Sequence, residues 1–277
     1  MDKEIKIAGK RIFYRVLGQG KPVMLVHGFG ETGDVWNDQV DFLNHDFRLI
    51  VPDLPGSGQS ELIDDMSMEG MAEVLKQILE KEISGLSGSS QVPPLGGFRE
   101  ARMIGHSMGG YITLAFVEKY ESLLRAFGLF HSSAFADTEE KKATRRKGIE
   151  FIKENGAFEF LKTSTPNLFA QRTKDESPEL VGQFIQSLNN FSAEALVSYY
   201  ESMIRRPDRT DLLRNTKLPV LFIFGEHDKA VPLEDVLKQC HLPEKSYFHV
   251  LHQSGHMGML EETEKSNRLL EEFLSGS

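Results

Sequence analysis

Short runs of apolar residues recur along the chain, and longer segments with apolar residues at helical spacing separate them. Six runs have the length of buried strands: 22–26, 48–51, 101–104, 126–130, 220–224 and 247–251. Strands that are apolar throughout are typical of parallel sheets, because helices cover both faces of such sheets. Two earlier stretches, 5–8 and 11–17, alternate around Gly9-Lys10 and predict an antiparallel hairpin.

Helical patterns lie between these runs, at 35–43, 68–83, 108–120, 233–239 and 261–273. Strands that alternate with helices indicate βαβ units. The pattern therefore predicts an α/β protein with a mostly parallel central sheet and helices on both of its faces.

One long segment, 137–209, is helical and polar in pattern and has no convincing buried strand. It opens with the charged run 138–147 and also carries large apolar residues: Phe151, Phe158, Phe160, Leu161, Phe169, Phe184, Phe191, Tyr199, Tyr200 and Met203. We predict a helical insertion here, with a core formed by residues 1–136 and 210–277. A helical subdomain that only stabilises the fold is the alternative.

The segment 84–99, just before the run at 101–104, is rich in Ser, Gly and Pro. Such a composition is typical of a flexible connection without a core of its own. We predict a loop there, of a length that is uncommon in a compact domain.

The overall composition narrows the possible partners and the compartment. The chain has 277 residues, 26% of them charged, and a formal net charge of −9, so phosphate backbones and membrane surfaces are poor partners. Its one cysteine, Cys240, excludes an internal disulfide and a Cys-rich zinc site. No secretory leader and no run of 18 apolar residues is present, so we expect a cytoplasmic protein of undetermined oligomeric state.

The motif Gly105-His-Ser-Met-Gly109 follows the apolar run at 101–104 and precedes the helical pattern at 111–120. A strand that turns this sharply into a helix holds Ser107 at the apex in a strained conformation, and glycines two residues away on each side let the two backbones approach. Ser107 then lies at a helix N-terminus, where developing negative charge is favoured. The alternative is a purely structural glycine-rich turn.

A serine hydroxyl is a weak nucleophile, so it needs a base and a carboxylate that orients the base. Among nine histidines, His256 has the best position, between the last strand and the last helix, and His252 is the reserve candidate. Asp228 follows the run 220–224 at the sheet edge where ligand sites of parallel sheets occur, and Glu226 is its rival. The remaining histidines and two further aspartates fit supporting, loop or core roles: His27, His106, His45, His131, His227, His241, His249, Asp53 and Asp137.

An oxyanion hole requires two N–H groups beside the nucleophile. We predict that one comes from Met108 and the other from Phe29 in the glycine-rich turn His27-Gly-Phe-Gly30. The alternative is that His27-Gly28 is only a tight turn of the backbone.

Six pieces of sequence taken together resemble the α/β-hydrolase superfamily, in its cap-bearing esterase-like branch. They are His27-Gly-Phe-Gly30, Trp36, Asp53-Leu-Pro-Gly-Ser-Gly-Gln-Ser60, Gly105-His-Ser-Met-Gly-Gly110, Gly225-Glu-His-Asp228 and Gly255-His256. The order Ser107, Asp228, His256 is the order of hydrolases built around such a serine turn. The insertion 137–209 falls where that family places its cap, and segment 84–99 is longer than the family leads us to expect.

The resemblance implies hydrolysis of a small to medium carboxylic ester, with water as the second substrate and no metal or organic cofactor. Ser107 in place of an aspartate favours attack on a carbonyl. His131, Tyr199 and Tyr200 are candidate substrate contacts. The alternatives are C–C bond or lactone hydrolysis, perhydrolysis, prolyl aminopeptidase activity and a receptor that retains the triad. The aminopeptidase would use cap acids such as Glu150, Glu154, Glu159 and Glu194.

Overall fold

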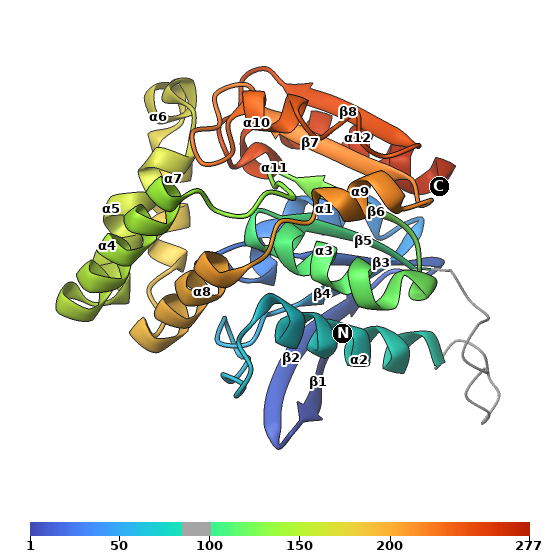
Figure 1. Ribbon diagram of the computed structural model, residues 1–277, viewed down its shortest axis with the longest axis horizontal. Helices are drawn as coiled ribbons and strands as arrows, with labels where there is room; N and C mark the ends of the chain where they lie inside the picture. The colour runs from blue at the N-terminus through green and yellow to red at the C-terminus, as the bar shows by residue number, and fades with distance from the viewer. Residues whose placement is uncertain (85–100) are drawn as a thin grey trace.

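A computed structural model describes residues 1–84 and 101–277, whose central feature is an eight-stranded sheet (Figure 1). The strands are listed in chain order as β1 Asp2–Ile7, β2 Lys10–Leu17, β3 Lys21–Val26, β4 Phe47–Pro52, β5 Ala101–His106, β6 Leu124–Phe130, β7 Val220–Gly225 and β8 Ser246–Leu251. Their spatial order is β1-β2-β4-β3-β5-β6-β7-β8. The hairpin β1–β2 and the pair β2–β4 are antiparallel, and every other neighbouring pair is parallel. The predicted mostly parallel sheet is thus confirmed.

Helices cover both faces of the sheet, as expected for strands that are apolar throughout. All six residues of β5 and all six of β7 are buried. The helices α2 Met68–Ser84 and α3 Met108–Tyr120 pack on one face, and α1 Asn37–Leu43 and α12 Thr263–Gly276 pack on the other.

Between β6 and β7 the chain forms several helices and no strand of the described sheet. They are α4 Glu139–Asn155, α5 Ala157–Ser164, α6 Gln171–Glu176, α7 Pro178–Ser187, α8 Ala193–Arg205 and α9 Thr210–Asn215. Thr138 caps the start of α4 by accepting the Lys141 N–H, and Gly156, at φ 89°, ends it. We call α4–α8 the cap helices; in Figure 1 they lie to one side of the sheet.

The boundaries differ from the sequence prediction at both ends of the core. The helix expected from residue 35 begins as a 3₁₀ turn, Gly33–Trp36. The helix expected at 261–273 is α12, which begins at Thr263 and follows a short helix that was not predicted, α11 Gly258–Glu261. Glu262 separates α11 from α12 because its backbone is not helical, and its carboxylate accepts hydrogen bonds from Gln253 N and Ser254 Oγ.

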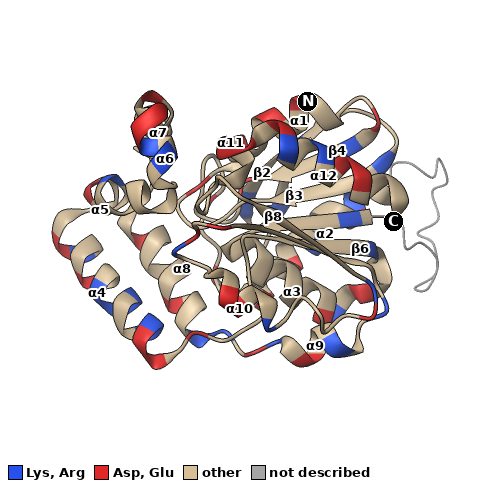
Figure 2. Cartoon of the chain, turned by 90° about the horizontal axis from the view of Figure 1, so that it is seen from above, with Lys and Arg blue, Asp and Glu red and all other residues tan. Residues whose placement is uncertain are grey.

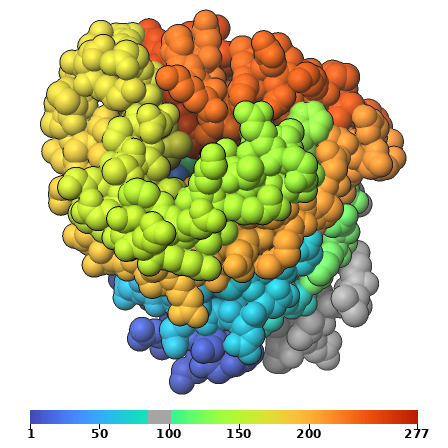
Figure 3. All heavy atoms as spheres, turned by 60° about the vertical axis from the view of Figure 1, so that its left-hand side comes forward, coloured from blue at the N-terminus to red at the C-terminus, as the bar shows by residue number. Residues whose placement is uncertain are grey.

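Of the predicted loop 84–99, Ser84 is the last residue of α2, and the rest lies outside the described residues. In the ranges 1–84 and 101–277, no helix is long and apolar enough to cross a membrane. Figure 3 shows a recess in the surface between the yellow-green cap helices and the orange and red C-terminal part of the chain.

Candidate active site

Ser107 occupies the turn between β5 and α3 in a conformation that side chains rarely adopt. Its backbone has φ 51° and ψ −115°. The Ser107 N–H donates to Phe130 O at 2.9 Å, and Ser107 O accepts from Gly110 N at 2.9 Å and Ser132 Oγ at 2.7 Å. These hydrogen bonds to β6, α3 and the loop after β6 hold the strained turn in place.

The two motif glycines are required by close backbone approaches. A Cβ on Gly105 would lie 2.3 Å from Gly109 O, and a Cβ on Gly109 would lie 2.4 Å from Val26 O in β3. Both distances are shorter than real Cβ atoms tolerate. The motif spacing therefore reflects the steric requirement of a sharp turn against a neighbouring strand.

Asp228 and His256 meet at the ends of β7 and β8. His256 Nδ1 donates to Asp228 Oδ2 at 2.7 Å, and Asp228 Oδ1 accepts from Ala230 N at 2.8 Å and Val231 N at 2.9 Å. The Asp228 side chain is fully buried and the His256 side chain is 4% exposed. Because a carboxylate only accepts, Nδ1 of His256 carries a proton, and Nε2 of the neutral ring is free to act as a base.

Burial and mutual attraction act in opposite directions on this pair. Burial alone would raise the pKa of Asp228, but the His256 charge and hydrogen bonds from two imidazoles hold it well below its usual range. Burial alone would lower the pKa of His256, but the Asp228 carboxylate raises it above its ordinary value. The arrangement thus stabilises an imidazolium at His256.

His131 is the second imidazole on this carboxylate. Its Nδ1 donates to Asp228 Oδ2 at 3.0 Å, and its Nε2 accepts from Gly258 N at 3.2 Å. Burial lowers the pKa of His131 to about 4, with the Asp228 hydrogen bond opposing that shift, so the ring is neutral. Its backbone also has a positive φ, 49°. His131, considered in the sequence as a substrate contact, thus contacts the carboxylate instead.

Ser107 and His256 line one cavity of about 150 Å³. The other lining residues come from the core and from the cap helices: Phe29, Glu31, Tyr111, Arg145, Leu168, Tyr200, Met203, Ala230 and Val231. The candidate contact Tyr200 is among them, whereas Tyr199 is fully buried outside it. The Tyr199 hydroxyl donates to Pro55 O at 2.5 Å and bonds Ser57 Oγ at 2.7 Å.

Glu31, which sequence reasoning missed, fixes the loop that carries Phe29. Its Oε2 accepts the Gly28 N–H at 2.6 Å and contacts His106 Nδ1 at 2.9 Å. Burial raises the pKa of Glu31, but the neighbouring His106 outweighs this and lowers it, so the carboxylate is ionised. The ring of Phe29 stacks on Tyr200 of α8 at 4.3 Å. Met108, the other predicted oxyanion residue, is buried and begins α3.

The cap also contacts the loop of the histidine. The His256 N–H donates to Leu168 O at 2.6 Å. The Glu261 carboxylate accepts N–H groups from Gly255 and Met257 on both sides of His256, and from Ala170 in the cap. The position of the His256 imidazole thus depends on the core and on the cap.

The rival residues have other partners. Glu226 and His252 bond each other at 2.7 Å on the surface, with side chains 47% and 68% exposed. Asp53 accepts the Gly33 N–H at 2.9 Å, and His27 Nε2 accepts the Leu54 N–H at 2.9 Å. These two residues shape the loops after β3 and β4.

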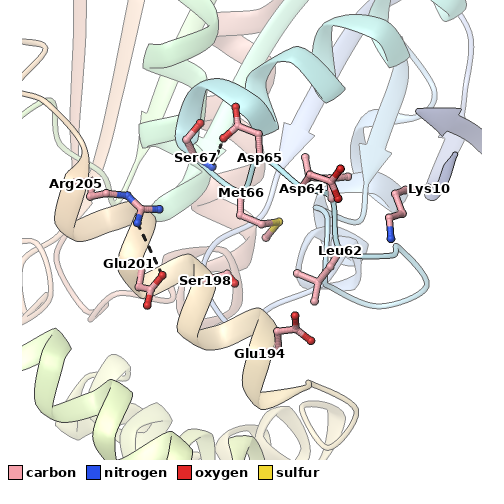
Figure 4. Close-up of a pocket in the computed structure, with 11 residues that line it drawn as sticks. Lys10, Leu62, Asp64, Asp65, Met66, Ser67, Glu194, Ser198, Glu201 and Arg205 are labelled. Carbon is pink, nitrogen blue, oxygen red and sulfur yellow. Dashed lines mark hydrogen bonds and ion pairs between the residues drawn. The ribbon is translucent and has the colours of Figure 1, made fainter. Parts of the chain in front are cut away.

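Two further observations concern other ligands. Within the described part of the chain, one group of residues has the side-chain types of a metal site within 4.8 Å, and it is His131, Asp228 and His256. Hydrogen bonds among these three already account for their proximity. A larger hollow of about 410 Å³, drawn in Figure 4, lies between the 62–67 loop and α8; its lining is rich in acidic groups and includes neither Ser107 nor His256.

Comparison with known proteins places the chain in a family. The sequence profile described as the alpha/beta hydrolase family matches residues 23–268. The chain belongs to the alpha/beta hydrolase family. The hydrolase is similar in structure to a thermophilic esterase from Thermogutta terrifontis, solved with malate bound, at 30% identity and a TM-score of 0.87 over 100% of this chain and 98% of that one.

Two curated relatives are named for different substrates. A 2-hydroxy-6-oxononadienedioate/2-hydroxy-6-oxononatrienedioate hydrolase of Paraburkholderia phymatum is 24% identical over 95% of this chain and 91% of that protein. A pimeloyl-[acyl-carrier protein] methyl ester esterase of Vibrio cholerae is 25% identical over 95% of this chain and 97% of that protein. Family membership supports hydrolase chemistry and leaves the scissile bond open.

Proposed function

We propose that this hydrolase cleaves small carboxylic esters through an acyl-serine intermediate. Ser107 Oγ attacks the ester carbonyl while Nε2 of His256 accepts its proton, and Asp228 orients the imidazole. The proton then passes to the departing alcohol, and water releases the acid and restores Ser107. The amides of Phe29 and Met108 stabilise the oxyanion.

One observation carries the proposal: a strained serine at a β5–α3 turn shares a small cavity with a histidine that is bonded to a buried carboxylate. The Thermogutta terrifontis esterase adds support at the level of function, because it is 30% identical to this chain over the whole length of the chain. The cavity volume, about 150 Å³, is below the range of about 300–1,000 Å³ usual for drug-sized ligands and favours a short acyl group.

The test is the initial rate on p-nitrophenyl esters of increasing acyl length, for the wild type and for Ser107→Ala. We expect a preference for short acyl chains and a loss in the variant of up to about a million-fold. Ser187→Ala, on the exposed surface of α7, is the control and is expected to behave as the wild type. Turnover that persists in Ser107→Ala would reject this mechanism.

C–C bond hydrolysis is the second candidate function. The Paraburkholderia phymatum relative favours it, because that protein is named as a hydrolase of 2-hydroxy-6-oxo acids. The chromophore of a 2-hydroxy-6-oxo-6-phenylhexa-2,4-dienoate would report this activity directly. Faster turnover of that compound than of any ester would replace the esterase assignment while retaining Ser107.

A further inference from the structure

A cationic side chain reaches the cavity from the cap side. Arg145 belongs to α4, along which basic and acidic residues are interspersed (Figure 2). Its side chain lines the same cavity as Ser107. Its Nε donates to Asp137 Oδ2 at 2.5 Å and its Nη2 to Asp137 Oδ1 at 3.3 Å. Its side chain keeps 20% of its surface exposed, whereas that of Asp137 is fully buried.

Asp137 cannot neutralise this cation alone, because it is shared with a second one. Arg206 Nη2 lies 2.9 Å from Asp137 Oδ1, and Arg206 also donates to Met203 O and Phe135 O. Two guanidinium groups thus surround one carboxylate, leaving a net positive charge. Since Arg206 is only 5% exposed, the accessible part of that charge is on Arg145.

Asp137 does not line the cavity, and the carboxylate that does, Glu31, already has partners. Glu31 accepts the Gly28 N–H and contacts His106, and its side chain is only 3% exposed. It therefore leaves Arg145 as the accessible ionic partner for a ligand.

Two tyrosines complete a set of hydrogen-bond donors beside Arg145. Tyr111 and Tyr200 line the same cavity, and the Arg145 guanidinium lies 5.4 Å from the centre of the Tyr200 ring. Burial raises the pKa of Tyr200 to about 12, so its hydroxyl keeps its proton. Over residues 1–84 and 101–277, neither hydroxyl nor Nη1 of Arg145 has a hydrogen-bond partner, and each is available to a ligand.

We infer that the site takes a short ester that carries a carboxylate at the end away from the scissile bond, with Arg145, Tyr111 and Tyr200 binding that carboxylate. The inference rests on the proposed function and names its substrate class. A guanidinium and hydroxyl donors match the oxygens of a carboxylate, and charge-assisted bonds of this kind are stronger than neutral ones. The cavity volume, about 150 Å³, favours an acyl chain no longer than medium length.

The kinetic test compares monomethyl adipate with methyl hexanoate, its uncharged counterpart, by titrating the acid released. We expect the wild type to favour monomethyl adipate in kcat/KM, and Arg145→Gln to reduce that preference by about 10- to 100-fold. Arg145→Lys should retain part of the preference, and Tyr200→Phe should reduce it by a smaller factor. Arg146→Gln, the exposed neighbour on α4, is the matched control and should keep the full preference.

The second measurement separates this inference from the proposed mechanism. Calorimetry of adipate and of hexanoate with Ser107→Ala reports the subsite without turnover. Binding of adipate that is lost in Ser107→Ala/Arg145→Gln supports the subsite even if neither ester is cleaved. Ser107-dependent cleavage of methyl hexanoate, with no preference for monomethyl adipate and no adipate binding, would overturn the subsite and leave the ester mechanism intact. An equal loss on both esters in Arg145→Gln would likewise overturn it, since it would make Arg145 only a support of the cap.

Discussion

The sheet and the cap helices both contribute to the cavity, but they position their residues by different means. At the ends of β5, β7 and β8, the backbone sets the positions of Ser107, Asp228 and His256. Between β6 and β7, long side chains such as Arg145 and Tyr200 reach the cavity from helices that pack on one another.

The two regions therefore differ in how much sequence change they tolerate. A strained turn with no space for one added methyl group tolerates little change, because backbone atoms surround it. A pocket wall made by side chains on helices can change its chemistry without moving the backbone. In the proposed mechanism, the fold of the core therefore positions the reacting groups, and side chains of the cap helices set the substrate preference.

The sharpest test of this difference adds one methyl group to a glycine in each region. In the core, Gly109→Ala places a Cβ 2.4 Å from Val26 O and 2.5 Å from His27 O, so α3 must shift away from β3. Because the Met108 amide and Ser107 move with it, we expect kcat/KM on p-nitrophenyl acetate to fall at least about 100-fold. In the cap, Gly182 of α7 has nothing within 4 Å of a Cβ. Gly182→Ala should retain activity and gain about 0.5–1 kcal/mol of unfolding free energy from helix propensity.

The measurements are kcat/KM on p-nitrophenyl acetate and the melting temperature, both taken for Gly109→Ala and Gly182→Ala. Near-wild-type rates in Gly109→Ala would show that the turn does not depend on this close approach, and the contrast between the regions would fail.

The features of the core could be predicted from sequence because backbone sterics leave local signatures. Gly105 and Gly109 flank Ser107 at fixed spacing, and uninterrupted apolar runs indicate buried strands. Asp228 and His256 each follow such a run, and the structure brings them to 2.7 Å of each other. The short helix α11 and the break at Glu262 were not predicted, because the contacts of Glu262 with Gln253 N and Ser254 Oγ leave no periodic pattern in the sequence.

The features of the cap could not be predicted in the same way. Arg145 lies in the charged run 138–147, and nothing in the sequence distinguishes it from the other basic residues of that run. Only its contact with Asp137 in the folded protein does so. Tyr199 and Tyr200 are adjacent and chemically identical, yet one bonds Pro55 O and the other lines the cavity. The rotation of a helix about its axis decides between them, and apolar spacing alone fixes that rotation only coarsely.

His131 tests whether the core supplies orientation as well as position. His131→Ala removes one of two imidazole donors from Asp228, so we expect kcat/KM to fall about 10-fold or more. His256 must be neutral to accept the Ser107 proton. Its raised pKa predicts that the wild-type rate falls as the pH drops through a value above about 6.5. With one donor lost, the Asp228 charge acts on His256 alone, so this limb of the pH–rate profile should move to higher pH.

His131→Asn is the control for that experiment, because asparagine tolerates the positive φ and offers an N–H to the carboxylate. It should restore most of the rate and return the limb toward its wild-type position. An unchanged profile in His131→Ala would mean that the second imidazole only fills space.

The smallest expected effect separates the two neighbouring tyrosines of α8. Tyr199→Phe removes a hydroxyl that joins the cap to Pro55 O and Ser57 Oγ, leaving both core groups buried without that partner. We expect a loss of about 1–2 kcal/mol in unfolding free energy, seen as a melting temperature lower by a few degrees. Tyr200→Phe removes a hydroxyl without a partner in the described structure, so its melting temperature should stay at the wild-type value. Equal melting temperatures for the two variants would show that the Tyr199 hydroxyl does not hold the cap on the core. The position of the cap would then depend on apolar packing, such as that of Phe29 on Tyr200.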